Sequence, residues 1–135
     1  MATYIEGALK KYLTDATAVS TICSARVYHM QAPPRVTKPY VFFYRVSDPH
    51  QAMYFDDTGD KTKAGQARFQ FSCVSSKPIV ALNLQKTVMQ RLRWASGTIN
   101  SYVIETISIE NMRQRIDPET KDNVYDVDVI CEYFE

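Results

Sequence analysis

The sequence is poor in the residues that catalytic, metal and cofactor sites usually need. Its 135 residues include only two histidines, three cysteines and four glycines. His29 and His50 stand apart from each other, whereas a zinc site needs three or four suitably spaced ligands. So few glycines leave little material for a phosphate-binding loop or for close backbone approach to a cofactor. The composition therefore predicts a protein that is not an enzyme and that holds no metal and no cofactor.

The cysteines do not form the pattern of a disulfide framework. Cys23, Cys73 and Cys131 are widely spaced and odd in number, which favours a reducing compartment. Cysteines without a paired spacing usually act as small buried hydrophobic residues. We expect all three to lie in the core.

The chain also lacks a strong net charge and a long apolar run. The formal net charge is +1, so no overall field draws the chain to nucleic acid or to anionic lipid. The longest apolar run is about six residues, against ~20 for a membrane helix, and no signal-peptide pattern is present. Hydrophobic residues make up 45% and charged residues 23%, which is ordinary for a globular protein. We expect one folded domain over residues 1–135, with no membrane contact.

Two acidic patterns resemble binding motifs without completing them. Asp56, Thr58 and Asp60 resemble the start of a calcium loop, but its twelfth position is Ala67 rather than a carboxylate. The Asp126-Val127-Asp128 stretch resembles a phosphotransfer pair, but it lies within a strand-like alternation of polar and apolar residues. Acids on one face of a strand are the simpler interpretation.

Hydrophobic spacing predicts two helices among several strands. One amphipathic helix is expected over residues 2–13, with a short helical turn after it through Val19 and Ile22. The second helix begins after Ser75 or Ser76 and ends at Gly97. Strands are expected over residues 27–30, 40–46, 51–55, 67–74, 102–110 and 124–134. This order predicts an α+β fold, in which two helices pack on a mainly antiparallel sheet.

The most informative stretch is RVYHMQAPPRVTKPYVFFYRVS, residues 26–47. Its prolines restrict their own φ and the preceding residue, so residues 31–38 are expected to form an extended, semi-rigid arm. The following run, 40–46, is aromatic or β-branched on both faces. This surplus of apolar surface predicts packing against another subunit.

Two polar segments are expected to project from the sheet. Residues 56–65 are charged and glycine-punctuated, which indicates a mobile loop, and residues 111–123 read as the link of a long hairpin. In the last strand, Tyr125 and Val127 face one way, while Asp126 and Asp128 face the other. We expect this acidic face to be exposed.

The order of these elements resembles the tail-completion (tail terminator, or tail-to-head joining) proteins of long-tailed bacteriophages. Three stretches carry the resemblance: RVYHMQAPPRVTKPYVFFYRVS, ARFQFSCVSS and ALNLQKTVMQRLRW. It extends over residues 5–133 and consists of structural pattern rather than a catalytic signature.

The resemblance implies a structural role. Proteins of this family form a six-fold ring that caps the finished tail tube and then docks to the connector under the head, leaving a channel for DNA. The implied partners are further copies of the chain, the tail tube protein and the head-completion or connector protein. DNA passes through without specific binding. The implied location is the tail–head junction of the virion, after assembly in the cytoplasm of the bacterial host.

The candidate contact residues come from the arm, the polar loop and the hairpin. They are Pro33, Pro34, Lys38, Asp57, Lys61, Lys63, Arg113 and Arg115. The candidate lumen acids are Asp126, Asp128 and Glu132, because a DNA channel works better with walls that repel phosphate.

Two other functions are compatible with the same sequence features. A head–tail stopper or a minor tail protein of the neck would have a similar composition. A single-stranded nucleic-acid-binding module would use basic residues interleaved with aromatics, although the aromatic consensus of sheet-based RNA binders is absent. Imaging of the neck would distinguish a stopper or minor tail protein from a tail-completion protein. Assays of nucleic-acid binding by the purified domain would test the second alternative.

Overall fold

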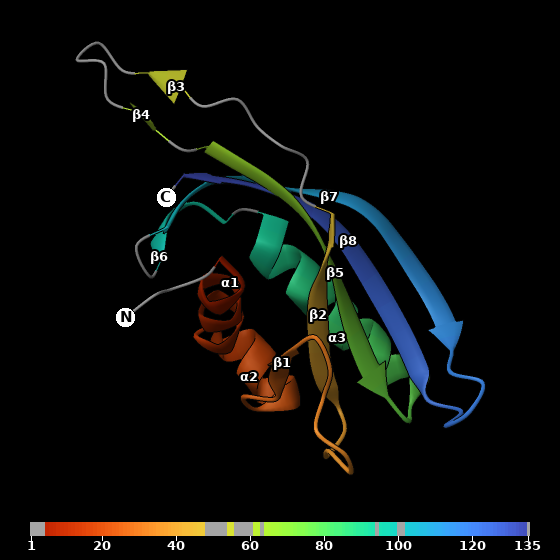
Figure 1. Ribbon diagram of the computed structural model, residues 1–135. Coiled ribbons are helices and arrows are strands. Elements are labelled where there is room, and N and C mark those ends of the chain that lie inside the picture. The colour runs from red at the N-terminus through yellow and green to blue at the C-terminus, as the bar shows by residue number, and fades with distance from the viewer. Residues whose placement is uncertain are drawn as a thin grey trace.

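A six-stranded sheet with three helices against one face forms the body of the protein (Figure 1). The computed structural model describes residues 5–47, 54–55, 61–62, 64–93, 95–99 and 102–134. The helices are α1 (Ile5–Thr14), α2 (Thr17–Cys23) and α3 (Pro78–Arg93). The strands are β1 (Val27–His29), β2 (Tyr40–Ser47), β3 (Tyr54–Phe55), β4 (Lys61–Thr62), β5 (Ala64–Ser75), β6 (Gly97–Ile99), β7 (Tyr102–Ile116) and β8 (Asn123–Phe134).

The strand order in the main sheet is β1-β2-β5-β8-β7-β6. Every neighbouring pair is antiparallel except β1 and β2, which run parallel. The short strands β3 and β4 pair with each other as a separate ribbon. The α+β class with a mainly antiparallel sheet is therefore confirmed.

Apolar residues at helical spacing place the helices on the sheet. Ile5, Leu9 and Leu13 form the buried side of α1, and α3 buries Ala81, Leu84, Val88 and Leu92. The segment expected to be a short turn is the seven-residue helix α2. The expected count of two helices was therefore too low, because α2 is too short to give a periodic signal and its N-cap residue makes no side-chain capping bond.

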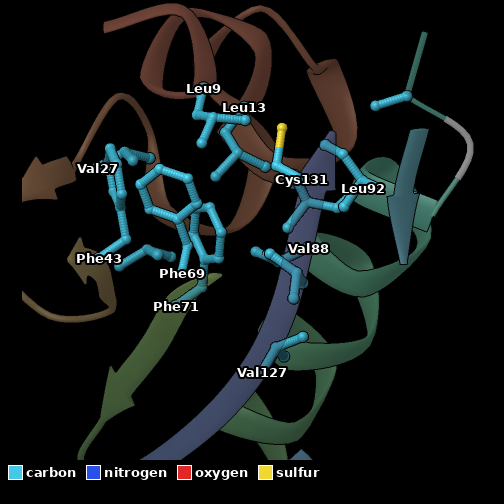
Figure 2. Packing of buried hydrophobic residues seen from close by; sticks show 14 of the residues in the cluster. Leu9, Leu13, Val27, Phe43, Phe69, Phe71, Val88, Leu92, Val127 and Cys131 are labelled. Carbon is cyan, nitrogen blue, oxygen red and sulfur yellow. The ribbon is translucent and has the colours of Figure 1, made fainter. Parts of the chain in front are cut away.

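The core lies between the helices and the alternating residues of β2, β5 and β8 (Figure 2). Its densest part is an aromatic cluster in which the rings of Phe43 and Phe71 stack with centroids 5.0 Å apart, while Phe69 lies 6.3 Å from Phe43. The three cysteines are free and buried, as predicted. Burial raises the pKa of each thiol, to about 12 for Cys131.

The proline segment returns on itself instead of forming a straight arm. Because β1 and β2 are parallel, the chain must travel back from the end of β1 to the start of β2 within residues 30–39. It does so through a turn at Pro34 and Arg35, where Arg35 has a φ of 60° and where Lys38–Pro39 is a cis peptide. In Figure 1 this loop, in orange, projects beyond the end of the sheet.

Three strand boundaries differ from the sequence prediction. β7 continues to Ile116, so residues 111–116 belong to a strand rather than to a link. β5 already begins at Ala64, inside the segment expected to be a loop, and β6 was not predicted. The last part of β7, residues 111–116, was missed because none of its residues is buried, so it shows no alternation of core and surface positions, although its partners lie on β8, the next strand of the same hairpin.

Candidate assembly interface

The sheet face opposite the helices carries a buried ion pair. Asp126 of β8 is only 1% exposed. One of its carboxylate oxygens accepts a 2.6 Å hydrogen bond from the hydroxyl of Ser72 on β5, and the other accepts a 2.9 Å bond from Nε of Arg115 on β7. Three neighbouring strands are therefore joined by one carboxylate. The expectation that Asp126 lies on an exposed face was wrong, because its cross-strand neighbours cover it.

A second group of polar side chains continues from this ion pair along the same face. Arg113 of β7 donates a 2.7 Å hydrogen bond to Oε1 of Gln70 and lies 3.4 Å from a carboxylate oxygen of Asp128. Gln70 in turn donates to the Ser72 hydroxyl over 3.4 Å. The sequence-predicted residues Arg113, Arg115, Asp126 and Asp128 thus meet in one network.

A glutamine of α3 ties the helix layer to these strands. Gln85 is fully buried, and its Nε2 donates to the backbone carbonyls of Asp126 at 2.9 Å and of Arg113 at 3.3 Å. The two carbonyls belong to paired residues on β7 and β8. Gln85 therefore fixes the position of the helix along the two strands. This role could not be predicted from the sequence, because the bonds of Gln85 reach backbone groups on distant strands.

A cleft of about 760 Å³ separates the proline segment from the β7–β8 turn. Pro33, Pro34 and Lys38 line one side of it, and Asp117 and Asp122 line the other. Nζ of Lys38 bridges the cleft with a 2.7 Å ion pair to the largely buried carboxylate of Asp122. Candidate contact residues that are distant in the sequence are thus brought together at one end of the sheet.

A group of aromatic residues lies at this cleft, and two of them, Tyr40 and Phe42, line it. Tyr40 lies 6.2 Å from Tyr28 and 6.4 Å from Phe42, measured between ring centroids. All three rings are half-buried, whereas the other face of β2 is in the core through Val41 and Phe43. Burial, and then the nearby Asp122 carboxylate, raise the pKa of Tyr40.

The remaining candidate residues are not part of these groups. Asp57 and Lys63 lie outside the described residues, and Lys61 is the first residue of β4. Glu132 lies on the same face as Asp128 and is partly exposed. Within the described part of the chain, no group of three or more His, Cys, Asp or Glu residues could hold a metal ion. None of the described helices is long and apolar enough to cross a membrane.

The outer edge of β7 is a feature that the sequence prediction missed. β6 pairs only with residues 102–104. From Glu105 to Ile116, the edge has no strand partner in the described part of the chain. Met112 and Ile116 on this stretch are 42% and 63% exposed. A long open edge with exposed apolar residues is typical of a surface that binds another chain.

The same fold occurs in a virion particle. A chain in the solved structure of the virion of a native gene transfer agent particle matches with a TM-score of 0.73 and 14% identity, over 97% of this chain and 95% of that chain. A second solved structure matches with a TM-score of 0.53 and 14% identity, over 96% of this chain and 92% of that chain. At such identity the likeness shows a shared fold alone. That fold is one used by a component of a virion.

A comparison with models of protein families identifies the family of the chain. The model of the tail completion protein gp17 matches residues 7–132, which is nearly the whole chain. The chain therefore belongs to the tail completion protein gp17 family, and it is a structural protein of the phage tail. No curated protein matches it. The resemblance stated from the sequence is confirmed, and so is a place in the virion.

Proposed function

We propose that the chain forms a six-fold ring that caps the finished tail tube and joins it to the connector of the head. Family membership and the fold of the gene transfer agent virion chain support this proposal. In this role the protein acts through contacts alone, without a catalytic step or a cofactor. It assembles in the host cytoplasm and remains at the tail–head junction.

The observation that carries the proposal is that the sheet bears projecting elements at two opposite ends. The proline segment and the β7–β8 turn lie at the Ser75 end of β5, because Val74 pairs with Tyr40 and Ser75 pairs with Asn123. The β3–β4 ribbon adjoins the other end of β5, at Ala64 (Figure 1). A joining protein needs two separate contact surfaces, one for each partner, and this arrangement supplies them about 40 Å apart.

The ring encloses the path of the DNA. Asp128 and Glu132 keep part of their side chains at the surface, so they are the acids that can line the lumen. Asp126 does not line the lumen itself, because its carboxylate is buried against Ser72 and Arg115. Acidic walls let DNA pass without holding it, since they repel its phosphates.

Deletion of the gene, followed by electron microscopy of the products, tests the proposal. We expect DNA-filled heads, separate tails and poor control of tail length, with joining restored when the purified protein is added. Density for the added protein should form a six-fold ring at the end of the tube. Joined particles with normal tails in the deletion strain would show that the protein is not required for tail completion. Density elsewhere in the neck would support a stopper or a minor tail protein.

A further inference from the structure

Charges of opposite sign are concentrated on two different parts of the fold. Residues 76–93, which include α3, contain four basic residues and no acidic one. Residues 105–132, which form β7, β8 and their turn, contain eight acidic residues against three basic ones. Soluble proteins usually mix the two signs over their surface. In a chain with a net charge of only +1, such separation makes two unlike surfaces complementary to each other.

The positive surface is the outer side of α3, which we call the basic stripe. Its members follow each other at intervals of four and three residues, so they share the side of the helix that faces away from the sheet. They are Ile79, Asn83, Lys86, Gln90 and Arg93, all of them exposed. Among the described residues, no carboxylate lies within 4.0 Å of Lys86 or Arg93. The contact of Arg93 with Met89, at 3.7 Å, does not neutralise its charge.

The negative surface is the open edge of β7 with the turn that follows, which we call the acidic edge. Its carboxylates belong to Glu105, Glu110, Asp117 and Glu119. None of them has a basic partner within 4.0 Å in the described part of the chain. The arginines of β7 do not neutralise this edge, because the network with Asp126 and Asp128 holds them on the sheet face.

We propose that the basic stripe of one copy covers the acidic edge of the next copy around the ring. This inference rests on the proposed ring and adds the two surfaces that form it. Natural proteins protect an open strand edge with charges or by covering it with a helix or loop. The contact joins two different surfaces, so it is heterologous and can close into a ring.

A helix is a better occupant for this edge than a strand from the other side of the sheet. The opposite outer strand, β1, has only three residues, whereas the basic stripe extends over four turns of α3. The lengths also match. Ile79 and Arg93 are about 21 Å apart along the helix, and Ile116 and Glu110 are about 20 Å apart along the strand. Exposed Ile79 can therefore pack near Ile116 while Arg93 reaches Glu110.

Cross-linking between two variants tests the contact directly. Arg93→Cys and Glu110→Cys are made in separate full-length chains, mixed, and treated with a short bis-maleimide at low salt, because the proposed contact brings these two exposed residues together. The native cysteines are buried and will not compete. We expect a cross-linked pair from the mixture, in solution at high protein concentration and on reconstituted particles. The control replaces Arg93→Cys by Lys10→Cys, because Lys10 is an exposed basic residue on α1, outside the stripe. Equal cross-linking by the control in both settings would overturn the proposal.

Charge reversal gives a second, functional readout. The variant with Lys86→Glu and Arg93→Glu should lower the yield of joined particles about tenfold or more, because it places like charges across the contact. Adding Glu110→Lys and Glu119→Lys to the same chain should restore much of the yield. If joining is unchanged while binding to a random-sequence DNA duplex falls, the stripe faces DNA and the proposal is wrong. If the wild-type protein does not join heads to tails at all, the proposed function itself fails, which is a distinguishable result.

Discussion

Replacing Ser72 with alanine should destabilise the protein by about 2 kcal/mol. The Ser72 hydroxyl is fully buried and donates a 2.6 Å hydrogen bond to the carboxylate of Asp126. A hydrogen bond to a charged group contributes about 1.5–3 kcal/mol, and alanine leaves the buried oxygen without this donor. Arg115 still compensates the charge, which keeps the loss in the lower part of that range. In a domain of this size, the melting temperature should fall by roughly 6–10 °C.

Urea and thermal unfolding, followed by circular dichroism, measure this loss. Ser108→Ala is the matched control, because Ser108 is an exposed serine on β7 and its removal should cost less than about 0.5 kcal/mol. A double-mutant cycle of Ser72→Ala with Asp126→Asn should return a coupling free energy of about 1 kcal/mol. Equal stability of Ser72→Ala and wild type, with an unchanged denaturant slope, would refute the view that this hydrogen bond holds β5 to β8.

Three other predictions follow from the packing and the electrostatics. Phe71→Ala should cost about 3–5 kcal/mol and the half-buried Phe42→Ala clearly less, and comparable losses in unfolding experiments would contradict the assigned faces of the sheet. Ellman's reagent at pH 8 should label the thiols only on unfolding, because burial raises their pKa values, to about 12 for Cys131; fast labelling of the native protein would disprove this. Asp122→Asn should lower the pKa of Tyr40, measured by phenolate absorbance, because it removes a negative charge near the phenol; a rise would contradict this. Since the pKa of Tyr40 is raised in the folded state, its contribution to stability is complete below the unfolded value of about 10 and is lost as the pH rises through the folded value.

The sequence predicts best where large apolar residues recur at every second position of a strand. In β5 and β8, core residues such as Phe69, Phe71, Val127 and Val129 alternate with residues of the other face, so both strands were found, β8 almost to the residue and β5 except for its start at Ala64. The helix α3 was found for the same reason, since its apolar residues recur at helical spacing. These patterns are local, and they are enough to predict an α+β fold.

The parts that were missed lack an alternation of buried and exposed residues or depend on contacts distant in the sequence. β7 extends through residues 111–116 because β8 pairs with it, although none of those six residues is buried. The candidate site shows the same limit. Arg113, Arg115, Asp126 and Asp128 were singled out one by one, but the network also needs Ser72 and Gln70 from β5. Strand register decides such pairings, and a single sequence does not encode register in any short segment.

The direction of the strands has a mechanical consequence for a protein that holds two bodies together. β5 and β8 share twelve register pairs, and β7 and β8 share another twelve. Both ladders run along the line between the two ends of the sheet. A pull between those ends would load the ladder hydrogen bonds in shear, all at once, instead of opening them one after another like a zipper. The buried Asp126 carboxylate fastens three of the strands at one level, so it resists the sliding that such a load would cause.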